Sequence, residues 1–259
     1  MARRSYRDDG YNDCVKSAAA LLTCALAISA QSPTRVAYTC TPEDIDSFGL
    51  ACSAEEPCPV FLELSSVDAA GATLVVAGDL HTERTTLYGI LLQSDDGGKS
   101  WTEPFKRLRA AALEQVQMLD FAYGWVGGEI IEPLPKDPFL LLTTDGGKTW
   151  RQQPLFEDSR FASLAQFWFD SRTSGKLVLD HPQGGAGKHE IYETNTGGEN
   201  WEINQVTDKP VNLKGPRPRE AATWRVRAEA SSKTYRLERR GSSSWELVAS
   251  FLIHVTDCK

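Results

Sequence analysis

Residues 94–101 read SDDGGKSW, and this stretch decides the fold because the chain repeats it. Residues 143–150 read TTDGGKTW, and residues 194–201 form a weakened copy, TNTGGENW. A fourth, eroded copy ends in SSSW at residues 242–245. The tryptophans that close these copies lie 49, 51 and 44 residues apart. A period of this length predicts one four-stranded unit per copy, which is the size of a propeller blade.

The residue types in the repeat suit a turn between two β-strands. An aspartate carboxylate can accept backbone N–H bonds inside such a turn and fix its shape. The glycine adopts backbone angles that other residues resist, and the tryptophan buries a large ring at the start of the next strand. We therefore assign a structural role, and not a catalytic one, to Ser94, Asp96, Gly98, Trp101, Thr143, Asp145, Gly147, Trp150, Thr194, Gly198, Trp201 and Trp245.

The pattern Ser/Thr-x-Asp-x-Gly-x-Thr-Trp resembles the Asp-box, or BNR repeat. This repeat occurs in sialidases, in sortilin-type receptors and in the photosystem II stability/assembly factor-like proteins. The first two copies match at every defining position except Ser100, and the third carries Thr196 in place of the aspartate. The resemblance covers roughly residues 60–250. It implies a β-propeller whose boxes lie on the outer rim, away from the binding face.

Strand-like segments around the boxes predict that each box joins the third strand of a blade to the fourth. The last strand of the first blade is expected over residues 101–107, and the last strand of the chain over 245–255. Residues 210–220 contain three prolines and read as a loop that replaces the first strand of blade four. The predicted fold is all-β, a propeller of about four blades of four antiparallel strands. It is either an incomplete arc or a ring closed by residues 34–60, since closure removes exposed edges.

The N-terminus predicts export. A basic start precedes a short apolar stretch that ends in small residues, SAAALLTCALAISA over residues 17–30. This arrangement is typical of a secretory signal peptide and is too short to span a bilayer. We expect a signal peptide at 1–30, a disulfide-containing segment at 31–59 and the propeller domain at 60–259. The protein is then secreted or periplasmic, and a lipid anchor at Cys24 is the less favoured alternative.

Cysteine usage agrees with an oxidising compartment. Of the six cysteines, Cys14 and Cys24 leave with the signal peptide. An even number remains in an exported chain, so disulfides are expected, and four cysteines allow three connectivities. The favoured pairs are Cys52–Cys58, across a short loop, and Cys40–Cys258, which ties the two ends together. A zinc site is disfavoured, because the spacing of Cys52 and Cys58 is unusual and no histidine lies nearby in sequence.

The charge balance argues against a nucleic-acid surface. The formal net charge is −7 and the pI is about 5.2, whereas nucleic-acid binding calls for a basic footprint. Residues 205–259 are an exception, with 11 Lys/Arg against 6 Asp/Glu. This basic tail is either a docking face for an acidic partner or, as we favour, a set of solvated strand faces.

Candidate catalytic residues are few. The early arginine signature of sialidases is absent, and the later arginines cluster in one degenerate blade. Glu129 and Glu132 form a carboxylate pair of the kind that a glycoside hydrolase needs. The simpler interpretation, which we favour, is that they mark the end of a strand. The glycine-rich stretch 184–188 fails the phosphate-loop pattern, because His189 follows the lysine where Ser or Thr is required.

One metal-ligand pattern stands out. Asp79, His81 and Glu83 alternate, so a continuous strand would place all three on one face. Polar neighbours at 82–86 favour an exposed hairpin instead. We therefore predict no metal site and no cofactor.

These features predict a binding or assembly scaffold and not an enzyme. The resemblance to the assembly factor-like branch implies an unidentified protein partner. The loops at 79–86 and 131–137, on the side opposite the boxes, are the expected binding loops. The alternative is a carbohydrate-binding protein or a sialidase-like glycoside hydrolase, with Trp125, Phe167 and Trp168 as possible glycan platforms. A third interpretation is a fragment of an envelope receptor.

Overall fold

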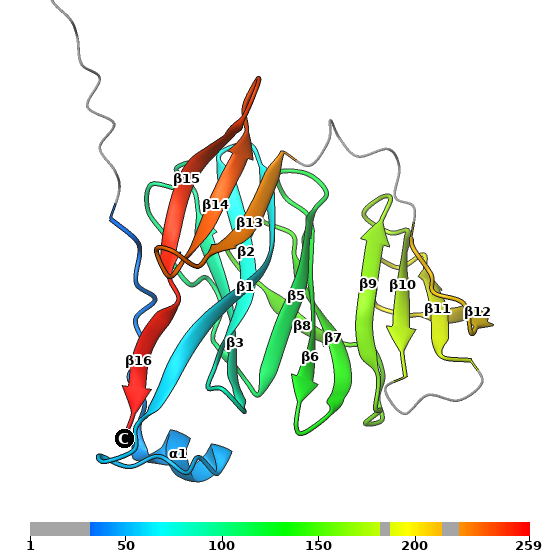
Figure 1. The fold of residues 1–259 in the computed structure, drawn as a ribbon. Helices are drawn as coiled ribbons and strands as arrows, with labels where there is room; N and C mark the ends of the chain where they lie inside the picture. The colour runs from blue at the N-terminus through cyan, green and yellow to red at the C-terminus, as the bar shows by residue number, and fades with distance from the viewer. Residues whose placement is uncertain (1–31, 182–186, 214–222) are drawn as a thin grey trace, which may run out of the picture. The chain divides into compact units, whose positions relative to one another are not determined.

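The computed structural model describes residues 32–181, 187–213 and 223–259, which belong to one compact unit, Gln31–Lys259. The signal peptide expected at 1–30 lies outside the described residues, as does most of the glycine-rich stretch 184–188. The described chain is almost entirely β, with sixteen strands and one short helix (Figure 1). None of its helices is long and apolar enough to cross a membrane. The strands form four separate antiparallel sheets, which matches the predicted class.

The first sheet has five strands in the order β16-β1-β2-β3-β4. They are β16 (His254–Cys258), β1 (Cys58–Ala70), β2 (Thr73–His81), β3 (Thr86–Ser94) and β4 (Leu108–Arg109). The strand expected over 101–107 is mostly absent: only Thr102 pairs with Gln93, before the two-residue β4. Pro104 explains the break, because proline has no N–H to donate to the ladder.

The second and third sheets each have four strands in simple up-and-down order. The second contains β5 (Ala111–Met118), β6 (Gly124–Ile131), β7 (Pro135–Thr143) and β8 (Arg151–Pro154). The third contains β9 (Ser163–Phe169), β10 (Gly175–Asp180), β11 (His189–Thr194) and β12 (Glu202–Thr207).

The fourth sheet has three strands, β13 (Trp224–Glu229), β14 (Thr234–Arg240) and β15 (Trp245–Leu252). The prediction of one strand over 245–255 is wrong. The chain leaves this sheet at Ile253, and residues 254–258 form β16, which pairs with β1 in the first sheet, beside it in Figure 1. Cys258 then lies directly across from Cys58, so the last strand is held by the first blade.

The repeated stretches form the same turn in three sheets. Ser94 and Thr143 each donate a hydroxyl bond of 2.8–2.9 Å to Asp96 and Asp145, and these carboxylates accept the backbone N–H of residues 100 and 149 at 2.9 Å. The paired glycines have φ of 74° and 93° in the first copy and 76° and 89° in the second. Each copy joins the third strand of its sheet to the following segment.

The third copy keeps the turn although it lacks the aspartate. The hydroxyl of Thr196 accepts the N–H of Asn200 at 2.9 Å, in place of a carboxylate. Its glycines have φ of 75° and 97°, close to the values in the other copies. The fourth copy has a different, tighter turn. A 2.8 Å bond from Gly241 N to the Ser244 carbonyl closes it.

Three hydrophobic clusters set the packing order of the sheets. One joins the fourth sheet to the first, the second joins the first to the second, and the last joins the second to the third. Among the described residues, no such cluster joins the third sheet to the fourth. The packing order is therefore fourth, first, second, third, and the architecture is an incomplete β-propeller.

Polar side chains on the first strand of one sheet bind the backbone of the first strand of the next. Val116 N donates to Ser66 Oγ at 3.1 Å. Gln117 does so twice: its amide nitrogen donates to the Phe169 carbonyl at 2.7 Å, and its oxygen accepts the Phe169 N–H at 2.8 Å. These bonds repeat at intervals of 50 and 52 residues, so they are a feature of the repeat.

A glutamine on the first strand of the third sheet makes the same pair of backbone hydrogen bonds to the chain that follows this sheet. Gln166 on β9 donates to the Val211 carbonyl at 2.6 Å and accepts from Leu213 N at 2.8 Å. Residues 211–213 therefore stand where the first strand of a further blade would lie. Most of the loop predicted at 210–220 lies outside the described residues, but its start occupies this strand position without joining a ladder.

The segment before β1 is anchored to the first blade. Disulfides join Cys40 to Cys258 and Cys52 to Cys58, the two pairs favoured from the sequence. The first bond ties the chain ends together within the first blade, so it does not close a ring. Between them lies a helix that the sequence analysis missed, α1 (Pro42–Phe48), which begins at Thr41 with a reciprocal cap to Asp44.

Candidate functional site

A hollow of about 660 Å³ lies at one end of the first two sheets. Three segments surround it: the β2–β3 hairpin, the turn between β6 and β7, and the end of α1. Both loops expected to bind from the sequence, 79–86 and 131–137, contribute residues to its lining.

The hollow lies away from the boxes. β3 begins at Thr86, which lines the hollow, and ends at Ser94, which opens the first box. β6 likewise ends at Ile131 beside the hollow, and β7 returns to Thr143 at the second box. The two structures therefore occupy opposite ends of the same strands, so the boxes shape the sheet without touching the site.

The floor of the hollow gathers acidic groups and one imidazole. Glu63 on β1 pairs directly with Asp79 on β2, and His81 follows two residues later on the same face. One ligand atom from each of these three residues lies within 4.8 Å of the others. Glu114 on β5 adds a further carboxylate to the lining. Within the described ranges, this is the one place where three metal-binding side chains converge.

Asp79 is the buried member of this cluster. It is 6% exposed, and no side-chain hydrogen bond or ion pair links it to another described residue. Burial, together with the charges of Glu63 and Glu114, raises the pKa of Asp79 to about 7. Burial also raises the pKa of Glu114, with a contribution from Glu63.

His81 is held in one tautomer. Its Nδ1 lies 2.8 Å from the Thr82 carbonyl oxygen. Because a carbonyl can only accept, Nδ1 carries a proton, and in the neutral imidazole the lone pair is on Nε2. Nε2 lies 3.8 Å from Glu63 Oε2, so the lone pair faces the carboxylates.

The alternation of Asp79, His81 and Glu83 breaks before the last residue. Thr82 N donates to the Thr85 carbonyl at 2.9 Å, and this bond turns the chain. Glu83 therefore lies in the exposed hairpin that we favoured, and Glu63 takes its place in the cluster. Glu63 is recognisable only from the β1–β2 register, which contains a bulge between Leu64 and Ser66 and cannot be counted from the sequence.

Other residues considered from the sequence have structural surroundings. Glu129 accepts from Leu164 N at 2.6 Å and from Ser163 Oγ at 2.9 Å, so it joins two sheets. Glu132 lies at the rim of the hollow, 3.4 Å from Lys136, and does not share a site with Glu129. Trp125 is fully buried and stacks on a phenylalanine ring at 3.8 Å. Phe167 is also buried in the core.

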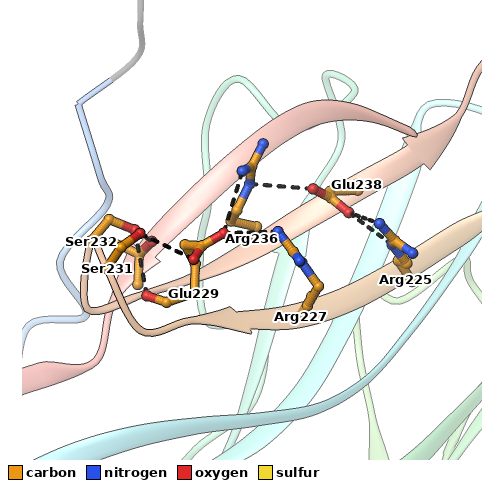
Figure 2. A network of polar contacts seen from close by, with 8 residues as sticks. Arg225, Arg227, Glu229, Ser231, Ser232, Arg236 and Glu238 are labelled. Carbon is orange, nitrogen blue, oxygen red and sulfur yellow. Dashed lines mark hydrogen bonds and ion pairs between the residues drawn. The ribbon is translucent and has the colours of Figure 1, made fainter. Parts of the chain in front are cut away.

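Four arginines of the basic tail pair with acidic residues of their own sheet, and Figure 2 shows three of them, Arg225, Arg227 and Arg236. The buried carboxylate of Glu238 pairs with Arg225 at 2.6 Å and with Arg236 at 3.2 Å. Glu229 pairs with Arg227 at 2.8 Å. These ion pairs support the interpretation of these arginines as residues of solvated strand faces. The three arginines therefore do not form an open basic patch.

Comparisons with known proteins return structures only, since no protein-family model and no curated protein matches the chain. YCF48 bound to a D1 peptide is 22% identical, covering 74% of this chain and 56% of that one, with a TM-score of 0.42. YCF48 from Cyanidioschyzon merolae is 16% identical over 74% and 57%, with a TM-score of 0.39. An alpha-L-arabinanase from Penicillium chrysogenum is 14% identical over 83% and 66%, with a TM-score of 0.40. The chain spans a little over half the length of the two YCF48 structures, and these neighbours are β-propeller proteins.

Proposed function

We propose that this protein is an exported scaffold that binds a partner protein in the hollow opposite the Asp-boxes, without catalysing a reaction. The observation that carries the proposal is the hollow itself. It is concave, it lies at an end of the sheets where connecting loops meet, and three separate segments of the chain build it.

The walls of the hollow are braced, which favours binding by a preformed surface. Arg109 donates to the Ser47 carbonyl at 2.6 Å and to its hydroxyl at 2.7 Å, which fixes the end of α1. Tyr88 donates to Asp44 at 2.5 Å and holds the start of the same helix. A rigid wall loses little conformational entropy when a partner docks.

The lining favours a protein over a glycan. Sugar-binding sites use exposed aromatic faces, and Phe48 is the one aromatic residue among the described residues of the lining. The guanidinium of Arg109 lies 4.2 Å from the centre of that ring and covers it. Of the three residues considered as glycan platforms from the sequence, Trp125 and Phe167 are buried in the core, and Trp168 is partly exposed on β9, outside the lining of the hollow.

A glycoside hydrolase is the second candidate, favoured by the raised pKa of Asp79. A protonated carboxyl near neutral pH is what a general acid requires. However, retaining enzymes place two carboxyl groups about 5–5.5 Å apart and inverting enzymes place them farther apart. One oxygen of Asp79 and one of Glu63 lie within 4.8 Å, which is near the retaining spacing, but Asp79 is buried, so a glycosidic oxygen would have little access to its carboxyl group.

Export remains part of the proposal. Two disulfides support an oxidising compartment, and the N-terminal 30 residues supply the expected signal. We propose a secreted or periplasmic location for the mature chain.

A blocked hollow tests the proposal. The mature, oxidised protein would be cross-linked in the envelope fraction of its host and captured, alongside Arg84→Trp, which fills the hollow, and Lys148→Trp, which lies in the second box. The proposal predicts a protein partner that is lost with Arg84→Trp and retained with Lys148→Trp. Equal capture by both variants would contradict it, and turnover of a glycoside panel by the wild type alone would favour the hydrolase.

A further inference from the structure

Two carboxylates and one imidazole meet at the floor of the hollow in an arrangement that the binding of a protein does not require. We propose that Glu63, Asp79 and His81 form a binding site for a divalent transition-metal ion, with zinc as the fitting member of the class. This inference goes beyond the proposed function, because it concerns the protein alone and needs no partner.

Asp79 is a buried carboxylate that has no side-chain hydrogen bond or ion pair to another described residue. A carboxylate that is 6% exposed ordinarily has a hydrogen-bond donor or a cation beside it, because burying an unpaired charge is costly. The nearest charged groups are instead two more carboxylates, Glu63 and Glu114. Asp79 lines the hollow, so its oxygens are open to an ion that enters there. A bound cation supplies the missing partner.

The orientation of His81 also favours a metal site. A metal-binding histidine commonly donates its other ring N–H to a carbonyl or a carboxylate, which fixes the tautomer and the direction of the ring. The 2.8 Å contact of Nδ1 with the Thr82 carbonyl meets this requirement. The free Nε2 points at Glu63, 3.8 Å away, where an ion would lie between the two groups.

The donor set selects the class of ion. One imidazole nitrogen with two carboxylate oxygens suits zinc and its neighbours, whereas calcium and magnesium prefer oxygen alone. Tetrahedral bonds of about 2.1 Å place donors roughly 3.4 Å apart. The 3.8 Å between Glu63 Oε2 and His81 Nε2 is close to this spacing. The Glu63 side chain is 56% exposed, so it can rotate to shorten this distance to the value that a bound ion requires. Three protein ligands leave a fourth position for water or for a group of a partner.

Calorimetric titration tests the site directly. The mature, tag-free, oxidised protein would be stripped with a chelator and titrated with Zn²⁺, and separately with Ca²⁺ and Mg²⁺. We expect one Zn²⁺ per chain and weaker binding of the other two ions. Asp79→Asn and His81→Ala should each weaken zinc binding at least tenfold. Glu83→Gln is the matched control, because it removes an acid from the same hollow but outside the cluster, and its affinity should stay within twofold of wild type.

Thermal denaturation separates loss of the site from loss of the fold. Zinc should raise the melting temperature of wild type and Glu83→Gln but not that of Asp79→Asn, whose metal-free form should melt no lower than wild type. Three results would overturn the proposal: no saturable zinc binding, tighter binding of Ca²⁺ than of Zn²⁺, or zinc binding that survives Asp79→Asn and His81→Ala but is lost in His189→Ala. The last result would place the ion at the His189–Asp180 pair. Partner capture with wild-type protein is scored separately, so each proposal can fail alone.

Discussion

Glu63 and Asp79 lie directly opposite each other on adjacent antiparallel strands, so two carboxylates share one face of the first sheet. Like charges in this position destabilise a sheet. The arrangement is costly for folding, and it coincides with the floor of a hollow that residues of the first two blades and α1 line together. Unfavourable local choices of this kind concentrate at functional sites.

Replacing Glu63 should therefore stabilise the metal-free protein. Glu63→Gln removes the charge across from Asp79 and keeps the size of the side chain. We expect the free energy of unfolding to rise by up to about 1 kcal/mol, measured by urea denaturation in the presence of a chelator. Destabilisation by this variant would show that Glu63 makes a favourable contact, contrary to our description of the cluster.

Gln117 should be a major support between the second and third sheets. Gln117→Ala leaves the N–H and carbonyl of Phe169 buried without partners, and we expect a loss of about 3 kcal/mol in unfolding free energy. Gln115 makes the same pair of bonds to Phe167 in a less buried position. Gln115→Ala is therefore the matched control and should cost less. Equal losses would mean that burial does not set the cost.

The third repeat offers a gain-of-stability test. Thr196 occupies the position at which the first two copies have aspartate. Its hydroxyl accepts one hydrogen bond from Asn200 N, in place of the bonds that the carboxylate accepts. Thr196→Asp should strengthen the turn and raise the unfolding free energy by about 0.5 kcal/mol, by analogy with a helix N-cap. Asp145→Thr makes the reverse change in the second copy and should lower it. Opposite signs in the two variants support the structural role of the box, and equal signs would contradict it.

Acid stability should depend on Asp120. Backbone N–H bonds from Tyr123 and Ala122 lower the pKa of Asp120 to about 2, below the ordinary value of about 3.9. Its charge therefore stabilises the fold above the ordinary pKa, and this contribution is lost as pH falls from about 5 towards 2. Asp120→Asn keeps an acceptor oxygen but cannot titrate. Its unfolding free energy should fall less steeply over this pH range than that of wild type, and parallel curves would contradict the assignment.

The two disulfides should differ in their effect. Cys40–Cys258 spans 218 residues and Cys52–Cys58 spans 6. Chain entropy predicts stabilisations of roughly 5 and roughly 2 kcal/mol at these separations. Replacing each pair with serines and comparing denaturant midpoints checks the order. A larger loss from the short bridge would contradict the order that chain entropy predicts.

Local patterns in the sequence predicted much of this fold. The turns at 94–101 and 143–150 depend on neighbouring residues, so their motif is readable without knowledge of the rest of the chain. The helix at Pro42–Phe48 was readable as well, because Thr41, Pro42 and Asp44 form a capped start, but it was overlooked.

The pairing of strands that are far apart in the sequence could not be predicted from the sequence. The union of β16 with β1 depends on contacts 200 residues apart, and the position of Glu63 depends on a bulged register. At 79–83 the alternation ends at a local turn after Thr82, as the polar residues 82–86 predicted, and what the sequence could not show is that Glu63 joins Asp79 and His81. The strand expected over residues 101–107 is different, because Pro104, which interrupts it, is visible in the sequence.

The central claim is that the hollow, and not the box end, is the binding surface. Its most direct test is a pair of photo-reactive residues, one replacing Leu134, 43% exposed beside the rim, and one replacing Lys148 in the second box. Illumination in the host envelope, followed by mass spectrometry, would identify what each position touches. Binding in the hollow predicts a specific protein cross-link from position 134 and none from position 148. A specific cross-link from 148 alone would place the partner on the box end and contradict the account.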